Sequence, residues 1–157
     1  MLDPRYIQYI NLPQIPKEII NLLPTDDSVW QKKDVKGTMP WYRWSDEYNQ
    51  EINKWCQENI CSDMYWAFQL MSDDMPKHID KGTATKFNYI ISTGGNDVWT
   101  RFWSNDQKTM LAEYQIEPFQ WHIFKADSYH SVEGIEPGQI RMAVTGRIFS
   151  NHESENL

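Results

Sequence analysis

Short strand patterns separated by turns are the feature that most limits how this chain can fold. From residue 64 onward, runs of aromatic and β-branched residues alternate with turn clusters, such as those at 93–97 and 105–107. Runs of this kind, bounded by turn residues, predict strands. The predicted strands cover residues 64–70, 85–92, 98–104, 110–116, 121–125, 130–132 and 140–149. Strands at this spacing favour a β-sandwich or a barrel.

The first third of the chain shows helical patterns. A short helix is predicted from Pro16 to Leu23, because proline suits the first helical position and apolar residues follow it. A longer helix is predicted from Ser45 to about Ile60, since Ser45 is a favourable N-cap followed by two acidic residues. We therefore expect a mostly β protein with flanking N-terminal helices. The expected single domain spans 1–157, with a helical buttress (1–62), a β core (63–150) and a frayed tail (151–157).

Composition narrows the classes of partner. The 157 residues carry a formal net charge of -7 and have a sequence pI near 5.0, which argues against nucleic acid as a partner. No apolar run is long enough for a membrane span, and the first residues lack the layout of a signal peptide. Cytoplasm is the expected location. Cys56 and Cys61 lie five positions apart on the predicted helix and are expected to be structural thiols. The oligomeric state is not indicated.

Three residues form a candidate metal site. His78 and Asp80 lie two positions apart, so they project from the same face of an extended chain. His130 opens a later predicted strand, after enough chain to return to the same end of a barrel. Two histidines and one carboxylate on one face leave open metal positions, as in non-haem Fe(II) oxygenases. The alternative is a surface His78 and a core His130 with no shared role.

The last predicted strand carries an unusual polar face. Met142 and Val144 share one face, whereas Arg141, Thr145 and Arg147 share the other. A buried arginine is costly unless it is paired, and no acidic residue on this strand can pair with it. A carboxylate ligand held by the guanidinium would supply that partner, with the Thr145 hydroxyl beside it. For Arg147, near the end of the strand, an ordinary ion pair is equally plausible.

Together, His78-Ile79-Asp80, His130 and Arg141 resemble the signature of the Fe(II)- and 2-oxoglutarate-dependent oxygenases. The prolyl-hydroxylase-like and aspartyl/asparaginyl-hydroxylase-like branches are the most similar. The resemblance runs from about residue 65 to residue 149. It implies a double-stranded β-helix, the jelly-roll or cupin-like core.

The resemblance also assigns roles to single residues. It implies His78, Asp80 and His130 as catalytic iron ligands. It implies Arg141 as the partner of the far carboxylate of 2-oxoglutarate, and either Tyr89 or Asn88 as a further contact. Many relatives carry Arg-x-Ser on the last strand. This chain has Ala143 at the serine position, so the serine's role shifts to Thr145.

The implied reaction is a hydroxylation. Fe(II), 2-oxoglutarate and O₂ are the expected cofactor and co-substrates, and a C–H bond of a protein, a peptide or a small molecule is oxidised with release of succinate and CO₂. Two alternatives use the same three ligands. One is a metal-binding jelly roll without catalysis, and the other is a zinc-dependent hydrolase. Both leave the predicted Arg141 and Thr145 pair without a purpose.

Overall fold

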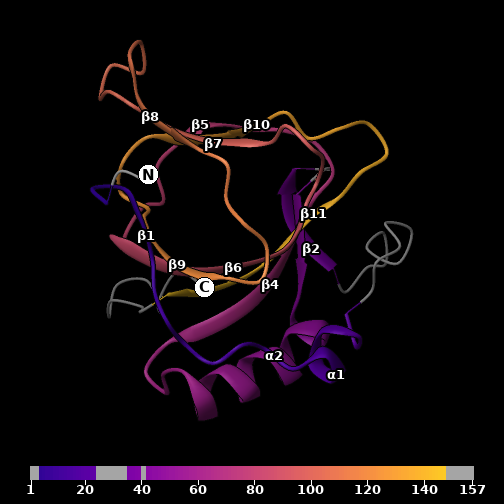
Figure 1. Cartoon of the computed structure of the whole chain (residues 1–157). Coiled ribbons are helices and arrows are strands. Elements are labelled where there is room, and N and C mark those ends of the chain that lie inside the picture. Colours follow the sequence, from indigo (N-terminus) through magenta and orange to yellow (C-terminus); the bar gives the residue numbers. More distant parts are fainter. Residues whose placement is uncertain (1–3, 24–34, 40–41, 148–157) are drawn as a thin grey trace.

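The computed structural model describes residues 4–23, 35–39 and 42–147. Two antiparallel sheets face each other, and the longer helix lies outside the larger sheet (Figure 1). The helices are α1 (Lys17–Ile20) and α2 (Asp46–Asn59). The strands are β1 (Ile7–Tyr9), β2 (Val35–Met39), β3 (Tyr42–Ser45), β4 (Tyr65–Met71), β5 (Met75–His78), β6 (Thr85–Thr93), β7 (Trp99–Trp103), β8 (Met110–Tyr114), β9 (Trp121–Lys125), β10 (His130–Glu133) and β11 (Arg141–Arg147).

The strand order shows how the chain winds. The seven-stranded sheet has the order β1-β9-β6-β11-β4-β3-β2, and the four-stranded sheet has the order β5-β10-β7-β8. From β4 onward successive strands belong alternately to the larger and the smaller sheet, except that β7 and β8 form a hairpin within the smaller sheet. This winding is a double-stranded β-helix, so the predicted fold class is confirmed. As a result, His78 and His130 lie on one sheet (β5 and β10), and Arg141 lies on the facing sheet (β11).

The main core lies on the outer face of the seven-stranded sheet. Trp66, Phe68 and Leu70 alternate along β4 and point to this face, where Tyr89 and Val144 join them. Helix α2 covers these side chains with its apolar stripe (Figure 1). The thiol of Cys56 is part of this core, and burial raises its pKa to about 12. This thiol is therefore structural, as expected, and Cys56 and Cys61 are both free.

The N-terminal third differs from the expected helical buttress. Strands β1, β2 and β3 extend the larger sheet at both of its edges, and α1 has only four residues. By contrast, α2 begins and ends close to the predicted positions. Strand β5 was not predicted because it contains Pro76, but it lies at the edge of its sheet, where proline is tolerated. The expected tail, 151–157, lies outside the described residues.

No helix in the described part of the chain is both long and apolar enough to span a bilayer.

Candidate metal centre

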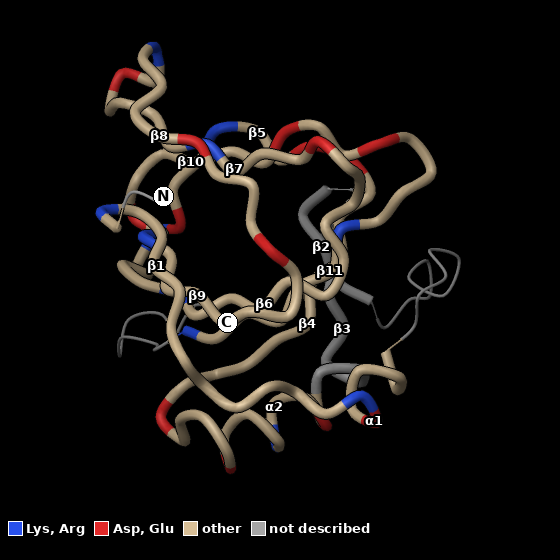
Figure 2. Tube along the Cα trace, viewed as in Figure 1, with Lys and Arg blue, Asp and Glu red and all other residues tan. Residues whose placement is uncertain are grey.

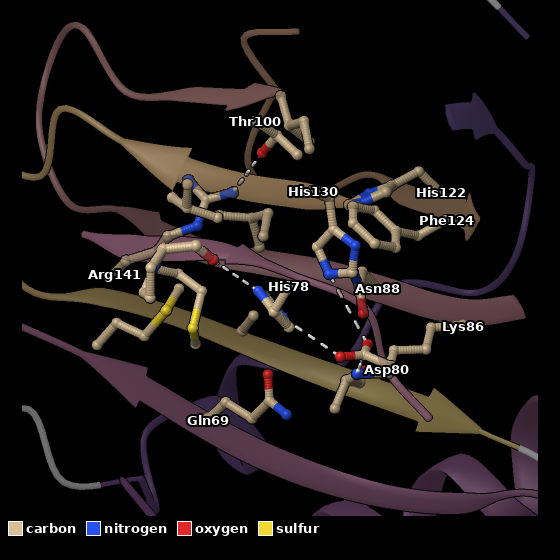
Figure 3. A pocket seen from close by; sticks show the side chains of 18 residues that line it. Gln69, His78, Asp80, Lys86, Asn88, Thr100, His122, Phe124, His130 and Arg141 are labelled. Atoms are coloured by element: carbon tan, nitrogen blue, oxygen red, sulfur yellow. Dashed lines mark hydrogen bonds and ion pairs between the residues drawn. The ribbon is translucent and has the colours of Figure 1, made fainter. Parts of the chain in front are cut away.

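Three predicted ligands meet at the rim between the two sheets (Figure 3). His78 ends β5, His130 opens β10, and these two residues are directly paired across the strands. Asp80 lies in the loop after β5, where its backbone N–H donates to the carbonyl of Ala126. One ligand atom from each residue lies within 4.8 Å of the others. This His78–Asp80–His130 triad has the ligand types and the close spacing that a divalent metal needs.

Backbone carbonyls orient both imidazoles. Nδ1 of His78 lies 2.8 Å from the carbonyl of Pro76, and Nδ1 of His130 lies 2.7 Å from the carbonyl of Ser128. A carbonyl only accepts a hydrogen bond, so Nδ1 carries the hydrogen in both rings. The other ring nitrogen, Nε2, faces Asp80, at 3.3 Å from Oδ1 for His78 and 3.9 Å from Oδ2 for His130. Outer contacts of this kind fix metal-binding histidines in proteins.

The charges of the triad suit a metal ligand set. Burial alone would raise the pKa of the Asp80 carboxyl, but the hydrogen bond to His78 and the charge of Lys86 hold it well below its usual range. Burial, reinforced by the charge of His78, lowers the pKa of His130 to about 4. At neutral pH the site therefore presents a carboxylate and a neutral imidazole. Both are the forms that bind metal. For His78, burial lowers the pKa, but the hydrogen bonds to Asp80 and to the Pro76 carbonyl outweigh it and raise the pKa, so a metal would compete with a proton for this ring.

Lys86 is a member of the site that the sequence did not single out. Its Nζ lies 2.5 Å from Oδ2 of Asp80, and the side chains of both residues are largely buried, with 13% and 16% exposed. Lys86 lies on β6 and points into the same cavity as the triad. The lysine thus supplies a positive charge next to the carboxylate in the metal-free protein.

A cavity of about 300 Å³ extends from the triad into the space between the sheets. Its size is at the lower end of the usual range for small-molecule sites. Apolar side chains from both sheets form much of its wall. They are Met71, Met75, Ile90, Ile116, Phe124 and Val132.

Arg141 points into this cavity from the start of β11 (Figure 3). Its guanidinium donates to the carbonyl of Thr93 at 3.2 Å and to the hydroxyl of Thr100 at 3.5 Å. Burial lowers its pKa to about 10, which leaves it charged at neutral pH, although the residue is only 5% exposed. None of the ion pairs found among the described residues involves this guanidinium. A buried cation in this state is suited to an anionic ligand.

The other predicted co-substrate contacts separate by strand face. Asn88 and Thr145 line the cavity. Tyr89 points the opposite way, into the outer core, where its ring packs 4.9 Å from that of Trp121. Of the two alternatives offered by the sequence, Tyr89 therefore does not line the cavity. Asn88 faces the cavity instead, because alternate residues of a strand point to opposite faces.

Three further polar residues of the cavity escaped the sequence analysis: Gln69, Thr100 and His122. The alternation of β6 and β9 contained a usable signal. Phe87, Tyr89 and Ile91 form the apolar set of β6, which leaves Lys86 and Asn88 on the inner face. Trp121 faces the outer core in β9, so His122 faces inward.

Comparison with known proteins supports the fold. No protein-family model matches the sequence, and no curated protein matches it. A prolyl-4-hydroxylase from Pseudomonas putida has a similar structure, with 12% identity, a TM-score of 0.56 and 92% of each chain covered. The chain has the fold of this hydroxylase. The α-ketoglutarate-dependent epimerase SnoN from nogalamycin biosynthesis is also similar, with 10% identity, a TM-score of 0.52, and 91% of this chain and 78% of that chain covered.

A third similar structure is AviO1 from Streptomyces viridochromogenes, with 10% identity, a TM-score of 0.50, and 93% of this chain and 90% of that chain covered. The chain covers only 53% of the length of one further solved structure that it matches, Peruvianin-I from Thevetia peruviana latex, with 8% identity, a TM-score of 0.40 and 58% of this chain covered. The predicted resemblance to oxygenases is thus confirmed at the level of the fold. The triad on this fold is a possible metal site.

Proposed function

We propose that the protein is an Fe(II)- and 2-oxoglutarate-dependent oxygenase that hydroxylates a C–H bond. The observation that carries this proposal is the buried Arg141 guanidinium, which shares one cavity with the triad. A metal site alone would need no cation in the cavity wall. A keto acid that chelates a metal and ends in a second carboxylate would use both.

The residues of the chain bind and orient the reactants. His78, Asp80 and His130 would hold Fe(II) on one face and leave the cavity side open. Arg141 would fix the far carboxylate of 2-oxoglutarate, and Asn88 and Thr145 would contact its other end. When bound, the iron supplies the activation of O₂, coupled to conversion of 2-oxoglutarate to succinate and CO₂. The apolar wall, including Ile90 and Val132, excludes water from the reacting groups.

A protein, a peptide or a small molecule is the substrate that we propose, and nucleic acid is not expected. Figure 2 shows the lysines and arginines of the described chain spread singly among acidic residues, without a basic stripe. Such a stripe is the electrostatic signature of phosphate-backbone binding. Arg101 and Trp103 do not line the cavity. They lie instead on the outer face of the four-stranded sheet, where Arg101 pairs with Glu113 and Glu133.

An anaerobic titration tests the proposal. Metal-free protein receives Fe(II) and then 2-oxoglutarate, and a weak visible charge-transfer band of the chelated keto acid is expected. His78→Ala should abolish the band. Arg141→Gln should keep the band but require much more 2-oxoglutarate, because only the far carboxylate loses its partner.

Arg101→Gln is the matched control, since it removes an arginine from the outside of the barrel. It should leave the 2-oxoglutarate requirement as in the wild type. Metal binding without any band at saturating 2-oxoglutarate would refute the proposal and favour a zinc hydrolase or a non-catalytic metal-binding module.

A further inference from the structure

Three polar side chains cross the floor of the cavity, which is the inner face of the seven-stranded sheet. Thr145, Asn88 and His122 lie side by side on β11, β6 and β9, because Thr145 pairs with Asn88 and Asn88 pairs with His122. All three line the cavity. Paired residues of neighbouring strands share one face of a sheet. These residues form a continuous strip, which we name the polar row.

The polar row contains buried atoms that lack hydrogen bonds. Both ring nitrogens of His122 and Oγ1 of Thr145 lack a well-formed hydrogen bond in the described part of the chain; the Gln120 carbonyl is close enough to affect the pKa of His122 but satisfies neither nitrogen by geometry. His122 is 0% exposed. Burial lowers its pKa to about 4; the nearby Gln120 carbonyl opposes this shift only in part, and the charge of Arg141 adds to it. The imidazole is therefore neutral at pH 7. Buried polar groups are nearly always paired, so these atoms are available to bind water or a ligand in the cavity.

The polar row begins one step deeper in the barrel than the triad. Lys86, two residues before Asn88 on the same face, pairs with Asp80. Phe124, two residues after His122 on the same face, places its ring 4.8 Å from the ring of His130. Two residues of a strand span about 7 Å. A group bound at the triad therefore lies next to the polar row.

Arg141 serves a different part of the cavity. Its guanidinium contacts Thr100 on the four-stranded sheet, opposite the floor. In Figure 3 the side chains of Arg141 and His122 lie on opposite sides of His130. The cavity thus has two polar ends, one charged and one neutral.

We propose that His122, together with Asn88 and Thr145, binds the metal-chelating carboxylate of the keto acid, while Arg141 binds its far carboxylate. A neutral imidazole, an amide and a hydroxyl can each donate one hydrogen bond. A carboxylate that chelates a metal through one oxygen has a second oxygen free to accept such bonds. His122 is then a binding residue on β9, a strand for which the sequence indicated no binding residue. The assignment rests on the proposed function, because it requires a metal-bound keto acid.

Two keto acids separate the two ends of the cavity. The affinity of the Fe(II)-loaded protein for 2-oxoglutarate and for 2-oxobutyrate, which lacks the far carboxylate, is measured anaerobically from the visible band. His122→Phe keeps an aromatic ring but removes both nitrogens. It should weaken binding of both keto acids by the same factor, roughly tenfold to a hundredfold. Arg141→Gln should weaken only 2-oxoglutarate. His122→Asn, which restores a donor, should recover part of the loss for both.

Ser92→Ala is the matched control, because Ser92 is on β6 but donates to the carbonyl of Ile140 outside the cavity. It should bind both keto acids as the wild type does. If the wild type gives no band with either keto acid, the proposed function itself fails. If the wild type gives the band and His122→Phe binds both keto acids normally, or weakens 2-oxoglutarate alone, the role of His122 is refuted and the oxygenase proposal stands.

Discussion

The ammonium of Lys86 lies 2.5 Å from the Asp80 carboxylate, at the position where a bound metal would also place positive charge. We expect Lys86→Met to lower the free energy of unfolding of the metal-free protein by about 2 kcal/mol, because a largely buried carboxylate loses its closest cation. Saturating Mn(II) should shrink this difference, since the metal neutralises Asp80 in its place. Urea unfolding with and without Mn(II) measures both values.

Lys77→Met is the control for this prediction. The Nζ of Lys77 contacts the carbonyl of Gln107 and the ring of Trp103, away from the triad. Its effect should be small and independent of Mn(II). A loss in Lys86→Met that grows when Mn(II) is added would instead make Lys86 an orienting partner of the bound metal.

Arg141 should cost stability in the absence of its ligand. Arg141→Met replaces a buried cation, which has no ion-pair partner among the described residues, with an apolar side chain, so the metal-free variant should be more stable by about 1 kcal/mol. The wild type loaded with Mn(II) should gain about 3 kcal/mol from 2-oxoglutarate at a hundred times its dissociation constant, and the variant much less. Thermal unfolding with and without 2-oxoglutarate tests this trade-off. Equal stabilisation of both proteins would exclude Arg141 as the anchor.

The pH dependence of folding should report on His122. Its folded pKa of about 4 lies below the usual value of 6.5, so the unfolded chain binds more protons between these values. The resulting stability is complete above pH 6.5 and is lost as the pH falls toward 4. His122→Phe should reduce the fall in unfolding free energy between pH 7 and pH 4 by about 3 kcal/mol. Urea unfolding at the two pH values measures it. An unchanged fall would show that His122 is not buried as a neutral ring.

Gly146 is required by the packing of the outer core. A β-carbon at this position would collide with the ring of Trp66 on the neighbouring strand. Gly146→Ala should destabilise the protein by about 1–3 kcal/mol through overpacking. Combining it with Trp66→Leu should cost less than the sum of the two changes, because the smaller side chain makes room. Additive effects in chemical unfolding would contradict the predicted clash.

The triad and Arg141 could be predicted from the sequence, mostly because residue spacing and strand alternation indicate where their side chains point. His78 and Asp80 share a face by spacing alone, and β11 has one apolar face and one polar face, which pointed Arg141 inward. The return of His130 to the same rim followed from counting strands.

Lys86, His122 and Thr100 were not accessible in the same way. Both faces of β6 are partly covered, one by the outer core and one by the cavity, so the usual contrast between a solvent-exposed and a buried face is weak. The partner of Lys86 is set by the loop that carries Asp80. Strand β1 was missed because it has three residues and lies at an edge, where pairing with β9 rather than its own pattern holds it extended.

The binding residues of the site come from both sheets. His78 and His130 belong to the four-stranded sheet, whereas Arg141 and the polar row belong to the seven-stranded sheet. A ligand bound both to the triad and to Arg141 would connect the two sheets. Relative motion of the two sheets would then be smaller whenever the ligand is bound. Under the proposed function, succinate has no keto group to chelate the metal, so this product would dissociate from the triad before it leaves Arg141.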